Sequence, residues 1–430
     1  MSANPKRNET SQIDFQQDTS QMNSLLAGTE APFSNNSVNI KVSIIIPVYN
    51  TAEYLPQCLE SAINQTLKEI EIIVIDDAST DNSLQIIRNY ESLDDRIKVI
   101  AFAENQGNGF GRNEAIRKAR GEYIMFLDSD DWADVNAGEA LYTKAIEQQY
   151  DMVMCGYVWH QTHIMNNNRN KQIFLPVVND NEPEFFRYLL QQIKGLSCMP
   201  WQYLFLTEML VKNSVRFAEG VYFEDVIFTI KAAHYAKSRG VVKATLLNYR
   251  YRTNSITHSV SKKKICDMHT SLISVKEFLD EKKIFKKYQK EYLIRYLQHA
   301  VCLSFLDYFR LPEAERDFEL DEYMSDIRKS SLLRLENLSL FRAEAQRFGE
   351  VERNTRQIYI AFHKILYNLK YHYVLFKVIF KSYYWICGLR DCGLAQLLNI
   401  RNASIDKSIA LKLNMLGKGS VIIPSQFRVQ

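Results

Sequence analysis

Two aspartates separated by one residue, Asp128 and Asp130, follow the apolar run Tyr123–Leu127. Side chains alternate along a strand, so acids at this spacing point the same way, beyond the strand's end. Paired carboxylates supply the oxygen ligands that Mg²⁺ or Mn²⁺ takes and shares with a substrate's phosphates. Because an Asp-x-Asp tripeptide is common by chance, its meaning depends on the elements that position it.

Strands and helices are expected to alternate along the chain before Asp128. Such alternation with short connections predicts an α/β fold with a doubly wound, mostly parallel sheet. Ligands of these sheets bind beyond the carboxyl ends of the strands, where four polar groups fall. The expected strands are Val42–Ile46 (ended by Pro47), Ile70–Ile75, Ile97–Phe102 and a fourth ending at Leu127; the helices are Leu55–Ile63, one through Asn89 capped by Thr80 or Asp81, and Arg112–Arg120; and the polar groups are Tyr49–Asn50, Asp76–Asp77, Asn105–Gly107 and Asp128–Asp130.

Three common nucleotide-binding motifs do not fit this edge. A phosphate-binding P-loop needs GxxxxGK[ST], which is absent. A dinucleotide fold needs GxGxxG after its first strand, where this chain has Pro47–Asn50. The glycine-rich stretch Gly107–Gly111 follows the third strand instead, and Arg112 stands where a third glycine would be. The glycine-rich, basic loop of a sugar nucleotidyltransferase is also missing.

Arg112 itself has two interpretations. It stands where a helix is expected to begin after a glycine-rich loop, so backbone N–H groups and its guanidinium could meet a phosphate. The alternative is an exposed helix charge beside Arg117 and Lys118. The sequence leaves both open.

Four motifs in order make the chain similar to the family 2 glycosyltransferases of the GT-A fold, of the type that builds bacterial surface polysaccharides. The resemblance covers roughly residues 41–258. The motifs are Val42–Asn50, Asp76–Asp81, Phe126–Asp131 and Phe217–Asp225.

The resemblance implies a nucleoside-diphosphate sugar as donor, with UDP as its nucleotide, and a role for each matching residue. The residues that it places around the nucleotide are Pro47 and Tyr49 in the base pocket, Asp77 on the uracil, Asp128 on the ribose, and Asp130 on an Mg²⁺ or Mn²⁺ ion that bridges the two phosphates. We also expect Asn105 and Gly107 to contact the donor, because they lie where the third strand ends. Arg252 and Ser255 would bind diphosphate oxygens, and His258 could approach the metal.

The same resemblance makes Asp225 the general base that takes the proton of the acceptor hydroxyl. Inversion at the anomeric carbon would follow from one in-line displacement. Glu224 is the rival base or an orienting neighbour, and Asp225 could instead be an ordinary N-cap of the following helix. Asp131 is most simply a solvated cap or a supporting acid.

The implied function is a metal-dependent glycosyltransferase that extends a polysaccharide or a lipid-linked glycan. The alternative is a non-catalytic scaffold that keeps the nucleotide-sugar pocket in a glycan assembly complex. The expected organisation is a disordered leader (1–39), a GT-A domain (41–260) with a nucleotide half (41–150) and an acceptor half (151–260), and a helical C-terminal region (262–430).

Composition limits the kinds of partner and the cellular location that we expect. A net charge of +3 in 430 residues gives no reason to expect nucleic acid binding. Seven scattered cysteines without zinc spacing predict reduced thiols in a cytoplasmic protein, and no secretory signal is evident. Within the aromatic and basic stretch Ile358–Leu398, Lys377 and Lys381 interrupt the apolar run Tyr371–Leu389, so a helix on the membrane surface, facing the cytoplasm, fits better than a spanning helix. The alternative is an ordinary packed helical domain with a basic outer face.

Overall fold

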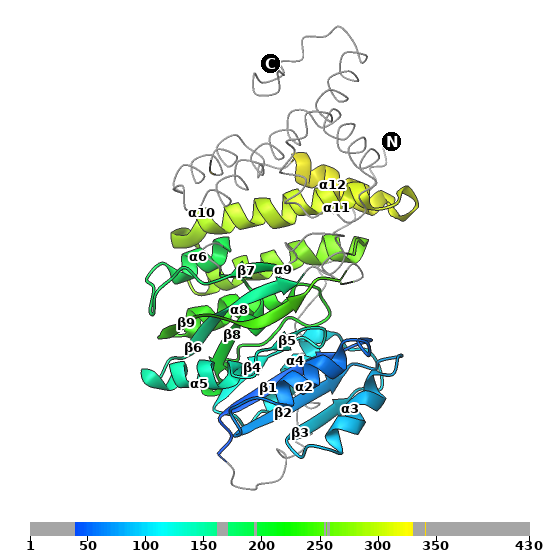
Figure 1. The fold of residues 1–430 in the computed structure, drawn as a ribbon. Coiled ribbons are helices and arrows are strands. Elements are labelled where there is room, and N and C mark those ends of the chain that lie inside the picture. The colour runs from blue at the N-terminus through cyan, green and yellow to red at the C-terminus, as the bar shows by residue number, and fades with distance from the viewer. Residues whose placement is uncertain are drawn as a thin grey trace, which may run out of the picture. The chain divides into compact units, whose positions relative to one another are not determined.

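The computed structural model describes residues 39–160, 171–192, 196–252, 255, 259–329 and 340 (Figure 1). The strands are β1 (Val42–Val48), β2 (Ile70–Asp76), β3 (Ile97–Ala101), β4 (Tyr123–Phe126), β5 (Trp132–Ala133), β6 (Met152–His160), β7 (Lys171–Phe174), β8 (Tyr203–Leu206) and β9 (Arg239–Arg250). The α-helices are α2 (Leu55–Ile63), α3 (Ser83–Glu91), α4 (Asn108–Lys118), α5 (Ala137–Glu147), α6 (Phe185–Gln191), α7 (Thr207–Lys212), α8 (Glu224–Tyr235), α9 (Lys262–Glu281), α10 (Phe285–Tyr296), α11 (Ser304–Arg310) and α12 (Phe318–Lys329). Two 3₁₀ turns, η1 (Pro200–Gln202) and η3 (Glu313–Glu315), and a π-helix, η2 (Leu297–Leu303), complete the described elements.

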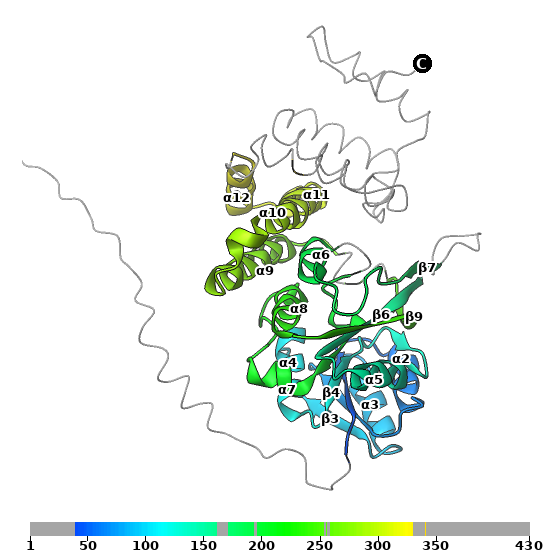
Figure 2. The same ribbon diagram turned by 90° about the vertical axis from the view of Figure 1, so that its left-hand side faces the viewer.

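The first four strands form a parallel sheet in the order β3-β2-β1-β4. The chain moves outward from β1 to β3 and then returns to the other side of β1 as β4. Right-handed crossovers therefore place α2 and α3 on one face of the sheet and α4 on the other, as Figure 2 shows. The reversal creates a switch point between β1 and β4, the place where such sheets bind ligands.

Helices on both faces explain why every residue of β1 and β2 is buried. β1 runs through Pro47, so the expectation that this proline ends the strand is wrong. The Ile45 carbonyl accepts from Leu127 on the β4 side, and the Val48 carbonyl accepts from Asp77 on the β2 side. Backbone groups alternate along the strand, so the missing N–H of Pro47 faces past the end of β4, where no ladder bond is lost.

The second half of the sheet has mixed directions. β8 lies antiparallel between β4 and β6, while β6 and β9 are parallel, and β5 closes the order β4-β8-β6-β9-β5. The predicted α/β class is confirmed, with a doubly wound, parallel first half of the sheet.

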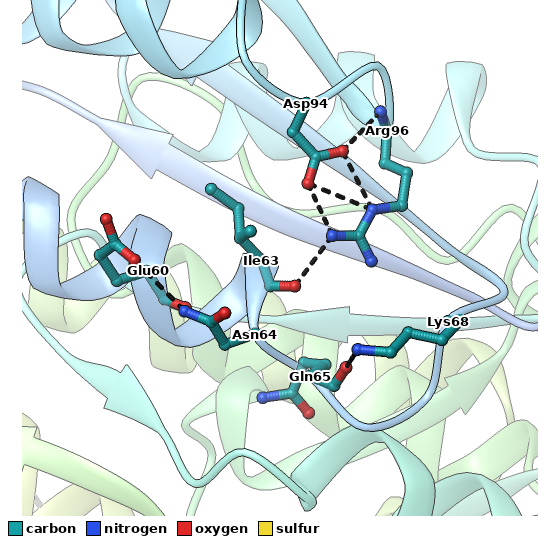
Figure 3. A network of polar contacts seen from close by, with 7 residues as sticks. All are labelled: Glu60, Ile63, Asn64, Gln65, Lys68, Asp94 and Arg96. Carbon is teal, nitrogen blue, oxygen red and sulfur yellow. Dashed lines mark hydrogen bonds and ion pairs between the residues drawn. The ribbon is translucent and has the colours of Figure 1, made fainter.

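Away from the strand ends, a polar network fastens the loop before β3 to the end of α2 (Figure 3). Arg96 pairs with Asp94 at 2.6 Å and donates from Nη2 to the Ile63 carbonyl at 2.8 Å. A cation on the last carbonyls of a helix satisfies groups that the helix leaves unpaired. This network connects α2 to the loop before β3 and lies away from the polar groups at the strand ends.

The helices after residue 262 pack directly on the sheet domain. α9 contacts α8, and α10 contacts α6. α9 begins after an ordinary N-cap, in which the Ser261 hydroxyl accepts from the Lys264 backbone. Arg187 of α6 pairs with the buried Glu291 of α10 at 2.7 Å. The three lysines Lys262–Lys264 form the first turn of α9, and Lys264 is buried there and pairs with Asp307.

Candidate active site

Asp77 organises the loop that follows β3 at the carboxyl ends of the strands. Its two carboxylate oxygens accept from the backbone N–H groups of Gln106 (2.7 Å) and Gly107 (2.8 Å). Asn105 donates to the Asp77 carbonyl at 3.2 Å, so the structure brings Asp77, Asn105 and Gly107 together as their positions at the strand ends predict. Asp77 is buried, whereas Tyr49 at the end of β1 is 45% exposed.

The helix after this loop starts earlier than expected. α4 begins at Asn108 with Gly107 as its N-cap, so Gly109 and Gly111 lie in its first turns and the glycine-rich loop predicted before Arg112 is wrong. Arg112 lies inside the helix and is only 4% exposed. The alternative of an exposed helix charge is therefore wrong too. Its guanidinium pairs with Asp128 at 2.8 Å and with Glu224 at 2.7 Å.

Three carboxylates crowd the end of β4. Asp128 faces Arg112, Asp130 faces Arg252 at 2.5 Å, and Asp131 accepts from the Arg250 backbone at 2.7 Å. Burial raises the pKa of Asp130; Arg252 opposes this shift and Asp128 adds to it. Burial, with Asp130 and Asp128 nearby, raises the pKa of Asp131 well above its usual range. Asp131 is thus a buried structural acid, not the solvated cap that the sequence suggests.

Two arginines at the end of β9 hold the turn that carries Asp130. Arg250 donates from Nε to the Asp130 carbonyl at 2.9 Å, and its guanidinium lies 4.8 Å from the Trp132 ring centroid. Arg252 lies over Tyr54 at 5.1 Å. Within the described residues, Arg252 Nε and Ser255 Oγ are buried without a hydrogen-bond partner. Two unpaired buried donors beside a carboxylate cluster are a place where anionic oxygens would be stabilised.

The donor set suits a hard divalent cation. It consists of carboxylate oxygens, and Asp128 lies close enough to Asp130 and Asp131 to add to the rise in pKa that burial causes in both. Arg252 is the cation on the Asp130 carboxylate in this structure. The part of the chain that the structure describes holds no ready group of three or more His, Cys, Asp or Glu ligands. Asp130 is the protein ligand expected there, and His258, the other candidate, lies outside the described residues.

Glu224 and Asp225 open α8 on the other side of Arg112. Phe223, in a left-handed conformation (φ 62°), is the N-cap residue, so the alternative that Asp225 is an N-cap is wrong. Glu224 is held by Arg112. Among the described residues, the Asp225 carboxylate makes neither a hydrogen bond nor an ion pair.

Burial raises the pKa of Asp225 to about 7, with Glu224 adding to the shift while Arg112 and Arg295 oppose it. A carboxylate with this pKa is half ionised near neutral pH. That is the range in which a general base both accepts a proton readily and is deprotonated often enough to act.

Two helices far apart in sequence hold the loop that leads into α8. From α4, Asn113 accepts from the Phe217 N–H (2.9 Å) and donates to the Phe217 carbonyl (3.1 Å). From α9, Asp267 accepts from the Tyr222 N–H (2.8 Å), and Ser271 donates to the Phe223 carbonyl (2.8 Å). These contacts stabilise the left-handed Phe223, a conformation that costs an aromatic residue free energy.

Gly109 is required where α4 meets this loop. A Cβ built on it would lie 2.1 Å from the Ala218 carbonyl oxygen, whereas one on Gly111 would lie 3.2 Å from a methyl group of Ile75. Gly109→Ala is therefore expected to destabilise the protein by about 1–3 kcal/mol, despite the higher helix propensity of alanine. Gly111→Ala is the matched control and should be near neutral. Thermal unfolding and transfer rates measure both, and equal behaviour would contradict the close approach.

Several site residues could not be predicted from the sequence, because the residues that they contact lie far away in the chain. Asn113, Asp267, Ser271 and Arg295 carry no motif, and Arg250 is noticed only through its neighbour Arg252. A polar residue on the buried face of a helix is the one sequence feature that could have indicated Asn113. Arg295 is 2% exposed on α10 and donates to the Leu189 and Leu190 carbonyls at 3.3 Å.

Comparison with known proteins identifies the class. Residues 43–210 match the family model described as glycosyl transferase family 2. The chain is 32% identical over 284 residues to the putative glycosyltransferase EpsH of Bacillus subtilis, covering 65% of this chain and 80% of that protein. It is 30% identical over 275 residues to the cholesterol galactosyltransferase of Borreliella burgdorferi, covering 62% and 75%. The chain belongs to glycosyltransferase family 2, and the protein is a glycosyltransferase, as its motifs predict.

The solved structures agree on the fold. The crystal structure of residues 1–349 of S. aureus TarS, in complex with UDP-GlcNAc, matches with a TM-score of 0.50 and 20% identity. The match covers 78% of this chain and 92% of that one. At this identity the likeness shows the GT-A fold alone.

Two expectations concern membranes and thiols. No helix of the described ranges is both long and apolar enough to cross a bilayer. The aromatic and basic stretch Ile358–Leu398, expected on a membrane surface, lies outside the described residues. The five described cysteines are free, and four of them are buried.

Proposed function

We propose that this glycosyltransferase moves a sugar from a UDP-linked donor to a hydroxyl of a polysaccharide or lipid-linked acceptor, with inversion at the anomeric carbon. One observation carries the proposal: Arg112 joins Asp128, at the strand ends that also carry Asp77 and Asp130, to the Glu224–Asp225 pair. Asp225 has a pKa of about 7. Because Arg112 holds Asp128 at the strand ends and Glu224 next to the proposed base, the two sides are placed for a single displacement between them.

The nucleotide of the donor would be bound by side chains that the structure already holds in position. Asp77 is buried with both oxygens oriented by backbone N–H groups, and each oxygen keeps a lone pair for a uracil N–H. Pro47 and Tyr49 would flank the base, and Asp128 would hold the ribose through the oxygen that Arg112 leaves free. The TarS structure, the fold neighbour, is in complex with UDP-GlcNAc, which supports UDP as the nucleotide.

The diphosphate would lie between Asp130 and the end of β9. Arg252 Nε and Ser255 Oγ, buried without partners in the described residues, would donate to its oxygens. Asp130, with His258 if that residue approaches, would hold Mg²⁺ or Mn²⁺. A divalent cation there supplies charge stabilisation as the diphosphate departs.

On the acceptor side, Asp225 would take the proton of the attacking hydroxyl while Glu224 stays paired with Arg112. The relative from Borreliella is named for a sterol acceptor, which supports a lipid-linked acceptor as one option. The proposed organisation is residues 41–150 for the nucleotide, 151–260 for the acceptor and the base, and 262–430 for acceptor binding, self-association or membrane docking. Free, mostly buried thiols support a cytoplasmic location.

A panel of nucleotide sugars tests the proposal directly. The purified protein is incubated with Mg²⁺ or Mn²⁺ and UDP-, GDP- or dTDP-linked sugars, and release of the nucleoside diphosphate and product mass are measured. Turnover with at least one UDP-sugar is expected, with a product of inverted anomeric configuration by NMR. Turnover with GDP- or dTDP-sugars alone would overturn the assignment of the base pocket, and a retained configuration would overturn the single displacement.

A further inference from the structure

Arg112 is a buried arginine that bridges two carboxylates from opposite sides of the site. Nη1 donates to Glu224 Oε1 at 2.7 Å and Nη2 donates to Asp128 Oδ1 at 2.8 Å. The Arg112 side chain is 5% exposed, against 29% for Asp128 and 12% for Glu224. Ion pairs this far from solvent are weakly screened, and they hold their partners in one geometry.

Contacts of α4 before and after Arg112, and one aromatic ring, restrain the position of the guanidinium. α4 is fixed at its start by the two backbone hydrogen bonds to Asp77 and in its middle by Asn113. The Phe217 ring lies 5.3 Å from the guanidinium and limits its rotation. Arg112 therefore acts as a fixed point between the end of β4 and the start of α8.

From this geometry we propose that Arg112 is a positioning residue for transfer, which sets the ribose-binding carboxylate Asp128 and the Glu224–Asp225 pair in register. The inference rests on the proposed function, because it takes Asp128 as a donor ligand and Asp225 as the base. It goes beyond phosphate contact, since both Nη groups are already engaged by carboxylates.

The bridge assigns different tasks to the two acids of α8. Glu224 is held by its ion pair with Arg112 and acts as an anchor, whereas Asp225 keeps its carboxylate for the acceptor. The charged groups that face Asp225 are Arg112 on α4, Arg295 on α10, Glu224 beside it and Asp128 beyond β4, with the Cys198 thiol also near. Arg112 and Arg295 lower the pKa of Asp225, and the other acids raise it.

Two substitutions separate the charge of Arg112 from its shape. Arg112→Lys keeps the positive charge but loses the planar fork that reaches both carboxylates. It should lower kcat at least about tenfold while leaving the acidic limb of the pH–rate profile near that of the wild type. Arg112→Gln removes the charge, so protonation of Asp225 becomes easier and the acidic limb should move to higher pH by about one unit or more. Both should weaken UDP binding, measured by calorimetry with UDP and Mg²⁺.

Glu224→Gln is expected to shift the acidic limb in the opposite direction, and combining it with Arg112→Gln should restore the wild-type limb. Removing the neighbouring negative charge should move the acidic limb to lower pH. The double variant Arg112→Gln/Glu224→Gln removes both partners of the ion pair, leaves fewer uncompensated buried charges, and should fold and bring the limb back toward the wild type. It is the variant to measure if Arg112→Gln alone does not fold, and Arg112→Lys serves if both fail.

Arg120→Gln is the matched control, because Arg120 also pairs with a buried glutamate, Glu71, at 3.0 Å but lies away from the site. It should lower the unfolding temperature without moving the limb. If Arg112→Gln behaves like Arg120→Gln, or if Arg112→Lys keeps full kcat and UDP affinity, the positioning role is wrong. Failure of the base assignment looks different: Asp225→Asn would then keep the wild-type rate and acidic limb, while Arg112→Gln would still weaken UDP binding through Asp128.

Discussion

Asp225→Asn should abolish transfer while leaving UDP binding intact. Asparagine keeps the shape of the side chain but cannot accept the acceptor's proton, and loss of a general base typically costs about 10²–10⁴-fold in rate. The measurement is initial transfer rate with the active UDP-sugar, beside calorimetric UDP affinity. A non-catalytic scaffold would bind UDP equally in both forms and transfer in neither.

The unfolding temperature shows whether a loss of transfer in Asp225→Asn comes only from a less stable fold. Burial raises the pKa of Asp225 in the folded protein, so its ionised form costs stability as pH rises through about 7. Asp225→Asn removes that cost, and its unfolding temperature at pH 8 should equal or exceed that of the wild type. Unchanged transfer would remove Asp225 from the mechanism, and Glu224→Gln would then identify the rival base.

Asp130→Ala should remove the metal dependence of donor binding. The wild type is expected to bind UDP more tightly with Mg²⁺ or Mn²⁺ than with a chelator, by about 10²-fold, because the cation contributes several kcal/mol of charge stabilisation. The variant should bind with the weaker affinity in both conditions. Calorimetry with and without metal makes the comparison.

A matched control distinguishes ligand loss from loss of the ion pair with Arg252. Arg252→Gln breaks the same ion pair but keeps the Asp130 carboxylate, so its UDP affinity should remain metal-dependent at a weaker level. If Asp130→Ala keeps the full metal effect, the ligand is another residue. If the wild type shows no metal effect at all, Arg252 alone is the cation that Asp130 uses.

Much of the donor side could be predicted because it depends on local pattern. Buried strands read as apolar runs, and parallel strands bring their carboxyl ends to one edge, so Asp77 and Asp128 were placed together by topology alone. The start of α4 was missed since glycine disfavours helix interiors, yet Gly109 is needed there by the approach of the Ala218 carbonyl. No rule of spacing reveals that requirement.

The acceptor side resists prediction for a different reason. Its supports come from contacts between residues far apart in the chain, such as Asn113 with Phe217 and Ser271 with Phe223. Hydrogen bonds of this kind produce no periodic pattern in the sequence from which they could be predicted. Arg295 reads as an ordinary helix charge until packing buries it, and burial is a property of the whole fold.

The hydrogen bonds from α9 to the loop before Asp225 bear on how such enzymes can exchange parts. The family match ends at residue 210, and a natural place to join segments from two relatives would be the start of α9. A chimera joined there whose foreign helix lacked Asp267 and Ser271 would lose both hydrogen bonds that hold the Tyr222–Phe223 loop. An exchange of segments that preserves this loop therefore has to carry α9 with it.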